Sequence, residues 1–160
     1  MALRDRLLLE VGRSRRYQTA LSLILVEADA WKNAEGSAGT GRAGEMIRNL
    51  ADLLTGRART TDFVARLSAG TFALILPETR GNDALLVAER VRAQVLASAA
   101  ECDTTVSCGV ASMHPGVTDA DALLEHAKTA LDVSRKLGHD CVTHYAALSD
   151  PSSVASGVLL

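Results

Sequence analysis

The chain has 160 residues, which is the size of a single domain that can bury a full hydrophobic core. Its composition, 48% hydrophobic and 22% charged, is that of a globular protein, and its net charge of −2 gives no reason to expect a nucleic-acid partner. The sequence contains no secretory apolar region and no apolar run near the length of a membrane span. We therefore expect a cytoplasmic protein without direct membrane insertion.

The first third of the chain predicts a helix, a strand, a loop and a second helix. Leucine and valine at helical spacing predict a helix from Leu3 to about Tyr17, and the apolar run over residues 21–26 predicts a buried strand. Residues 33–44, rich in Gly, Ala and Ser, predict a loop. Apolar residues from Met46 onward then mark one face of a helix that ends near Gly56.

The middle of the chain predicts a hairpin followed by a helix. Residues 62–67 and 71–76 are typical of strands, and Ser68-Ala69-Gly70 between them is a turn signal. Pro77 is expected to end the second strand because proline cannot donate a backbone hydrogen bond. Residues 82–96 place apolar side chains on one side of a helix.

The last third predicts a strand, a helix and a short strand. Apolar residues alternate with small or polar ones over residues 104–111, which indicates a strand. Thr118 is expected to cap the next helix and Gly138 to end it. A short strand over residues 141–144 follows, and residues 146–160 lack a clear period, so we expect a flexible C-terminal tail.

This order of elements predicts an α+β fold, an α/β sandwich. We expect a central mixed, largely antiparallel sheet of about five strands, flanked by helices, in one domain over residues 1–145. The cysteines (Cys102, Cys108 and Cys141) are odd in number and lack metal-ligand spacing, and the four histidines form no ligand pair at helical spacing. The sequence therefore predicts no metal site, no cofactor and no disulfide framework.

Five sequence blocks in a fixed order carry a resemblance to a known family. They are Leu23–Lys32, Asp62–Leu67, Phe72–Pro77, Ala88–Arg92 and Thr105–Ala111. With these blocks the chain resembles the GGDEF domains, which make or sense the second messenger cyclic di-GMP. The resemblance covers most of the chain and implies the nucleotidyl cyclase-like form of the α+β fold.

The hairpin that gives this family its name differs in the present chain. The family has Gly-Gly-Asp/Glu-Glu-Phe, whereas this chain has Ser68-Ala69-Gly70-Thr71-Phe72, in which only the core Phe matches. The resemblance implies that an acidic hairpin residue and an Asp at the end of the first strand hold two Mg²⁺ ions. Here Glu27 stands at the strand position and the hairpin offers only Gly70 and Thr71. A metal pair would be poorly held.

The substrate-binding positions that the resemblance implies are also altered. The family reads guanine with an Asn and an Asp, where this chain has Glu35 and Gly44. Lys32 and Arg135 stand where the family has lysines that face phosphates, and His139 stands at a family arginine. We therefore expect no catalytic residues and no cyclase activity.

A second family feature is retained. Many GGDEF domains carry an inhibitory product site, Arg-x-x-Asp, five residues before the hairpin motif, and Arg59 and Asp62 have this spacing. Arginine can bond to guanine O6 and N7 or to phosphate, and a carboxylate can accept from guanine N1–H and N2–H. Arg90, on the following predicted helix, matches a further arginine of such sites. The resemblance thus implies that Arg59, Asp62 and Arg90 bind cyclic di-GMP.

The sequence leaves three functions open. The first is a catalytically inactive receptor for cyclic di-GMP that signals through a protein partner, a neighbouring domain or a homodimer. The second is a ligand-independent interaction or dimerisation scaffold, in which Arg-x-x-Asp has no role. The third is residual GTP binding or cyclase activity that uses Glu27, Asp29 and Lys32. We take the first as the leading hypothesis.

Overall fold

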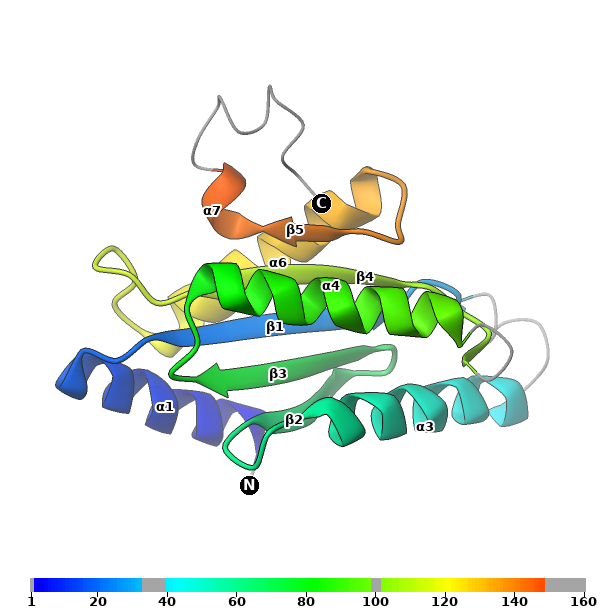
Figure 1. The fold of residues 1–160 in the computed structure, drawn as a ribbon, viewed down its shortest axis with the longest axis horizontal. Helices are drawn as coiled ribbons and strands as arrows, with labels where there is room; N and C mark the ends of the chain where they lie inside the picture. Colours follow the sequence, from blue (N-terminus) through cyan, green and yellow to red (C-terminus); the bar gives the residue numbers. More distant parts are fainter. Residues whose placement is uncertain (1, 33–39, 99–101, 149–160) are drawn as a thin grey trace.

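A computed structural model describes residues 2–32, 40–98 and 102–148. A single sheet runs through the centre of the molecule, with helices packed on both of its faces (Figure 1). The elements, in chain order, are α1 (Leu3–Tyr17), β1 (Leu21–Ala28), α3 (Thr40–Arg57), β2 (Phe63–Ser68), β3 (Thr71–Pro77), α4 (Gly81–Ala97), β4 (Val106–Ser112), α6 (Ala120–Lys136), β5 (Val142–His144) and α7 (Tyr145–Leu148).

The sheet has five strands in the order β2-β3-β1-β4-β5. β1 is the central strand and pairs antiparallel with both β3 and β4, whereas β4 and β5 pair in parallel. β1 takes the centre because nearly all of its side chains are apolar and buried, so both of its faces can be covered. The prediction of a mixed, largely antiparallel sheet in an α+β fold is confirmed.

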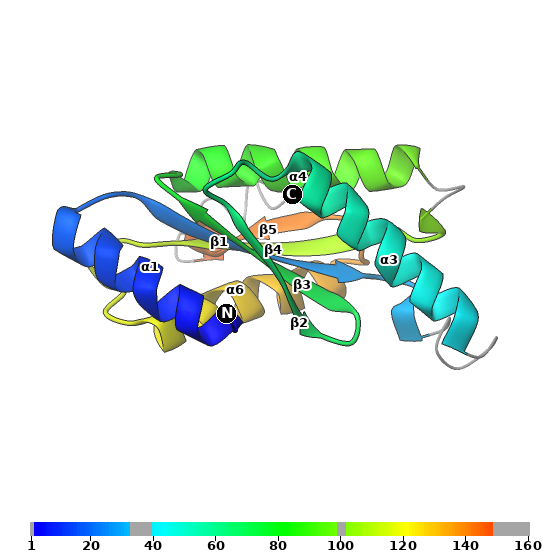
Figure 2. The ribbon, with the colours of Figure 1, turned by 90° about the horizontal axis from the view of Figure 1, so that it is seen from below.

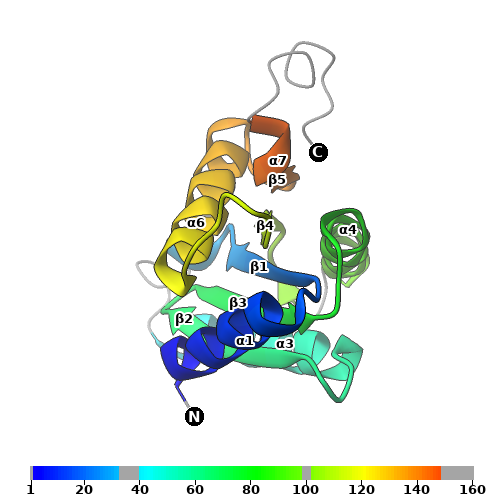
Figure 3. The same cartoon turned by 90° about the vertical axis from the view of Figure 1, so that its left-hand side faces the viewer.

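Two apolar cores lie on opposite faces of the sheet. Side chains alternate along β1, so Ile24 and Val26 face the core under α3 and α4, and Leu23 and Leu25 face the core under α1 and α6. Figure 2 and Figure 3 show α3 and α4 on one side of the sheet and α6 on the other. This arrangement places the turn between α3 and β2 close to the edge of the sheet, where the candidate site lies.

Most predicted elements form near their expected boundaries, with three differences. α3 begins at Thr40, so the predicted loop over residues 33–44 ends earlier, and residues 33–39 lie outside the described residues. The cap of α6 is Asp119 and not Thr118, because the Asp119 carboxylate accepts from the backbone N–H of Ala122 at 2.8 Å. Residues 146–148 of the predicted tail belong to α7, and 149–160 lie outside the described residues.

Cys102 and Cys108 are buried in the core, and Cys141 is partly buried. Burial raises the pKa of the Cys108 thiol far above its usual range, which makes this group unreactive. Within the part of the chain that the structure describes, no helix is both long and apolar enough to cross a bilayer.

We expect His144 to make stability depend on pH. Its ring is partly buried at the end of β5, close to Gly81, and burial lowers its pKa below 6.5. The unfolded chain therefore takes up a proton on this histidine at higher pH than the folded chain does. The free energy of unfolding therefore keeps its full value above about pH 6.5 and falls as the pH is lowered through that value. Urea unfolding at pH 7.5 and 5.5 measures this difference. The free energy of unfolding should fall less between the two pH values in His144→Gln than in the unaltered chain, and equal falls would contradict the prediction.

Candidate functional site

The turn that leads into β2 joins two of the three residues predicted to bind ligand. The Asp62 carboxylate accepts from the backbone N–H of Arg59 at 2.9 Å. The Arg59 guanidinium donates back to the same carboxylate from Nε at 3.2 Å and from Nη2 at 2.9 Å. Arg59 and Asp62 therefore form a closed, two-pronged ion pair in this structure.

The two members of this pair differ in accessibility. The Arg59 side chain is 56% exposed, whereas the Asp62 side chain is 6% exposed beneath it. Nη2 of Arg59 also donates to the carbonyl of Pro77 at 3.2 Å and to the hydroxyl of Thr79 at 2.7 Å. The hydrogen bond to Asp62 raises the pKa of the guanidinium, so Arg59 stays charged. Arg59 faces solvent, and Asp62 orients it from below.

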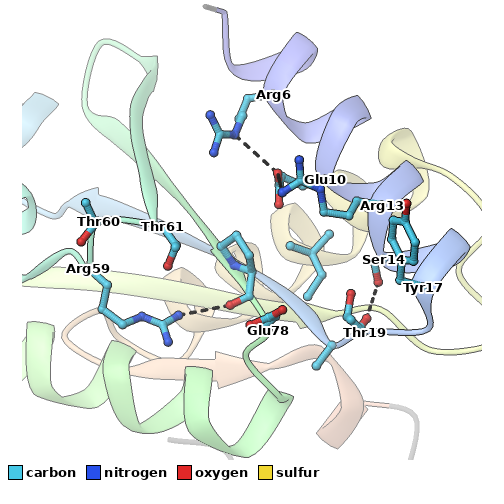
Figure 4. Close-up of a pocket in the computed structure, with 13 residues that line it drawn as sticks. Arg6, Glu10, Arg13, Ser14, Tyr17, Thr19, Arg59, Thr60, Thr61 and Glu78 are labelled. Atoms are coloured by element: carbon cyan, nitrogen blue, oxygen red, sulfur yellow. Dashed lines mark hydrogen bonds and ion pairs between the residues drawn. The ribbon is translucent and has the colours of Figure 1, made fainter.

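A pocket of about 610 Å³ opens beside Arg59 (Figure 4). Its volume lies within the range of small-molecule binding sites. One wall is the turn before β2 and the end of β3, and the opposite wall is α1 with the segment that follows it. The lining residues are Arg6, Glu10, Arg13, Ser14, Tyr17, Thr19, Ala20, Leu21, Arg59, Thr60, Thr61, Pro77 and Glu78.

The α1 wall carries a buried carboxylate between two arginines. Glu10 is 2% exposed, and its Oε1 lies 3.7 Å from Nε of Arg6 and 3.6 Å from Nη1 of Arg13. With Arg59 on the facing wall, three guanidiniums border the pocket, against the carboxylates of Glu10 and Glu78. Sequence reasoning did not connect the α1 residues to the site, although the local density of arginines at the start of the chain was a signal.

Arg90 lies on the exposed side of α4, which packs on the face of the sheet opposite to α1. Among the described residues, no hydrogen bond or ion pair joins it to Arg59 or Asp62. It lies one helical turn before Gln94, whose amide oxygen accepts from Arg57 in the segment just before the Arg59 turn. Arg90 therefore lies one helical turn from a residue that contacts Arg57, and it does not line the pocket.

Glu27, which stands where the resemblance implies a metal ligand, forms an ion pair with Arg135. The Glu27 carboxylate accepts from Nε of Arg135 at 2.8 Å and also from Nη2 of the same side chain. The hydroxyl of Thr71 donates to Glu27 at 3.1 Å. The hydrogen bond to Glu27 raises the pKa of the Arg135 guanidinium. Arg135, which the sequence predicted to face phosphates, neutralises this carboxylate instead.

Asp29, the second carboxylate near the end of β1, also has its oxygens occupied. It accepts from the hydroxyls of Thr105 and Ser107, both at 2.6 Å. It lies 3.1 Å from Nδ1 of His139 and accepts from the backbone N–H of Asp140 at 3.1 Å. His139 and Asp140 both adopt positive φ, and their bonds to Asp29 hold this turn after α6 in place. Asp29 therefore has a structural role.

The hairpin supplies no carboxylate to this region. β2 ends at Ser68 and β3 begins at Thr71, and a Cβ on Gly70 would lie 2.6 Å from the ring of Trp31. Over the described residues, no cluster of three or more His, Cys, Asp or Glu side chains is placed to hold a metal ion. One carboxylate already paired with arginine does not fit the pair of Mg²⁺ ions that the family implies.

The other positions that the resemblance assigns to substrate binding do not line the pocket beside Glu27. Lys32 is exposed in the last residues described before the gap, and Gly44 lies inside α3. Glu35 lies outside the described residues. The structure thus brings together Glu27, Thr71 and Arg135, which line a pocket of about 350 Å³, and it does not bring Lys32 or Gly44 to that pocket.

Comparison with known proteins identifies sequences and folds that are similar to this chain. The family model described as "Diguanylate cyclase, GGDEF domain" matches residues 1–141. "Diguanylate cyclase DosC" of Escherichia coli (strain K12) is 28% identical over 138 residues, which cover 83% of this chain and 30% of DosC. The chain therefore spans less than a third of the length of this relative.

Two solved structures illustrate the similarity in three dimensions. The coiled coil and GGDEF domain of DgcB from Caulobacter crescentus, in complex with c-di-GMP, has a TM-score of 0.79 and 26% identity, covering 88% of this chain and 77% of that one. Diguanylate cyclase SiaD from Pseudomonas aeruginosa, in complex with its activator SiaC, has a TM-score of 0.81 and 28% identity, covering 89% and 56%.

Proposed function

We propose that this chain, which belongs to the GGDEF domain family, is a receptor for cyclic di-GMP and not a cyclase. The observation that carries the proposal is the contrast between two sites in one domain. The catalytic position Glu27 is neutralised by Arg135, while Arg59 presents an exposed guanidinium at the mouth of a pocket of about 610 Å³.

The proposed loss of catalysis follows from the carboxylates that a metal pair would need: one is already paired and the other is missing. A two-metal phosphoryl-transfer site needs several oxygen ligands that are free to bind the ions. Glu27 is bonded to Arg135 and Thr71, and the hairpin from Ser68 to Thr71 has no acidic side chain. Freeing Glu27 would break its ion pair with Arg135, and the hairpin would still provide no carboxylate. The relatives named as diguanylate cyclases therefore do not make this chain a cyclase.

The ligand site is suited to a guanine-containing diester. A guanidinium can donate two parallel hydrogen bonds to guanine O6 and N7, or to a phosphate. The ion pair with the buried Asp62 keeps the Arg59 side chain beside the pocket, so less side-chain entropy is lost on binding. Arg90, on α4, does not line this pocket, and we propose that it meets a second part of a dimeric ligand. DgcB, the similar structure that contains c-di-GMP, shows that a domain of this fold accommodates this ligand.

We further propose that binding acts through contacts with a partner protein, a neighbouring domain or a second copy of the chain. SiaD shows a similar domain in a protein that assembles with an activator protein. A ligand-independent scaffold is the alternative. In that case the contacts with a partner would be the same with and without cyclic di-GMP.

Calorimetric titration of the purified domain with cyclic di-GMP tests the receptor proposal. We expect binding with a Kd of about 1 μM or tighter, which corresponds to about −8 kcal/mol. Cyclic di-AMP is the matched control, because adenine presents a donor where guanine presents the O6 acceptor to Arg59. A titration without heat at tens of micromolar protein would reject the receptor in favour of the scaffold.

Incubation with GTP tests the catalytic part of the proposal. We expect no cyclic di-GMP after prolonged incubation of the domain with GTP and Mg²⁺, because the carboxylates needed for the metal pair are missing or paired. The GGDEF domain of DosC, assayed in parallel, provides the positive control. Product that accumulates in proportion to the amount of this domain would show that the altered site still works.

A further inference from the structure

The Arg59 guanidinium already donates hydrogen bonds along two of its edges in the ligand-free structure. Its Nε and Nη2 donate along one edge to Asp62, and the remaining Nη2 hydrogen points to Thr79 and Pro77. An arginine binds an acceptor pair two-pronged through either its Nε/Nη2 edge or its Nη1/Nη2 edge. Both edges include Nη2. No two-pronged contact with a ligand is available until Nη2 leaves one of its present partners.

Thr79 is the stronger of the two partners outside the ion pair. Its hydroxyl lies 2.7 Å from Nη2, against 3.2 Å for the carbonyl of Pro77. Thr79 is only 6% exposed, so water cannot easily take the place of its hydroxyl as the acceptor for Arg59. The hydroxyl also donates to the Pro77 carbonyl at 3.0 Å, which leaves its lone pairs directed at Arg59.

The segment that carries these acceptors is fixed by the sheet. The buried hydroxyl of Ser22, on β1, donates to the carbonyl of Thr79 at 2.7 Å. The backbone N–H of Glu78 donates to the carbonyl of Ala20 at 2.7 Å, and Glu78 itself has a positive φ of 51°. Because the acceptors cannot follow the guanidinium, Arg59 must move away from Thr79 when it turns to a ligand.

We propose that Thr79 competes with the ligand for Arg59 and so sets the affinity of the site. This inference rests on the proposed function, since it concerns the same arginine. Thr79 holds the guanidinium against the end of β3, and the ligand must break that contact before it can form a two-pronged one. We call the state with Arg59 bonded to Thr79 the closed state, and the ligand-free chain is in it. The apparent Kd is then the intrinsic Kd divided by the fraction of molecules in which Arg59 is released from Thr79.

Thr79→Val is the variant that separates this proposal from a structural role. Valine keeps the branched shape and the apolar packing of threonine and removes the acceptor. We expect cyclic di-GMP to bind about tenfold tighter, because one hydrogen bond from a charged group is lost from the closed state only. Thr104→Val is the matched control: Thr104 is about as buried, at 8% exposed, and its hydroxyl bonds to the backbone of Ala30 and Thr105, away from the pocket.

Two measurements give the result. Calorimetry compares the Kd of cyclic di-GMP for the unaltered domain, Thr79→Val and Thr104→Val. NMR of the arginine side chains follows rotation of the Arg59 guanidinium in the ligand-free protein, which should be faster in Thr79→Val and unchanged in Thr104→Val. Tighter binding with faster rotation in Thr79→Val alone is the expected outcome.

Two other outcomes overturn different claims. If Thr79→Val folds normally and binds cyclic di-GMP as weakly as the unaltered domain or more weakly, Thr79 does not compete with the ligand. If the unaltered domain does not bind at all, the proposed function fails. NMR then still tests the hydrogen bond between Arg59 and Thr79. Equal rotation rates of the Arg59 guanidinium in the two valine variants would show that Thr79 does not restrain Arg59.

Discussion

Substituting Arg59 by alanine is expected to weaken cyclic di-GMP binding by about a hundredfold or more. Arg59 is the one member of the Arg-x-x-Asp pair that is exposed to a ligand, since Asp62 is buried beneath it. Two hydrogen bonds from a charged group contribute about 3 kcal/mol or more together, and each 1.4 kcal/mol is about tenfold in Kd. Calorimetry on the variant measures this directly.

Arg57→Ala is the control for the loss of positive charge in the same segment. Arg57 contacts Gln94 and is not among the residues that line the pocket, so we expect less than about a threefold change in Kd. Arg59→Ala should remain folded, because the backbone N–H of residue 59 still donates to Asp62. Similar losses in both variants would mean that general charge, and not the Arg59 contact, attracts the ligand.

The largest expected effect on stability comes from Gly109→Ala. Gly109 lies in β4 directly under α6, and a Cβ there would lie 2.4 Å from the carbonyl oxygen of Ala127 and 2.4 Å from the backbone nitrogen of Leu131. Both atoms belong to the helix backbone, so no side-chain rotation can relieve the overlap. The helix must move off the sheet. We expect a loss of about 3 kcal/mol or more in the free energy of unfolding.

The same substitution at Gly12 provides the control. Gly12 lies in α1, and a Cβ there would meet nothing within 4 Å. Alanine favours the helix by about 0.5–1 kcal/mol over glycine, so Gly12→Ala should be neutral or slightly stabilising. Denaturation in urea measures both variants. A loss below about 1 kcal/mol for Gly109→Ala would show that α6 does not pack this closely on β4.

The sequence by itself determined the order of the elements and the family. The helical spacing in residues 3–17, the apolar run of β1 and the turn signal before Thr71 depend on neighbours within a few positions, and the structure confirms these elements at nearly the predicted boundaries. The missing hairpin carboxylate could also be predicted, because it depends only on which residues stand in the motif. The cap of α6 was wrong by one residue, since Thr118 and Asp119 are both good caps.

Only the tertiary structure decided how the charged residues pair. Glu27 meets Arg135 and Arg59 meets Thr79 because strand register and helix packing bring them together across 108 and 20 positions of the chain. In the same way α1 becomes one wall of the pocket beside Arg59, which no local pattern indicates. A side chain's nearest partner is set by distances of a few ångströms, and those distances are fixed only when the whole sheet and its helices have assembled.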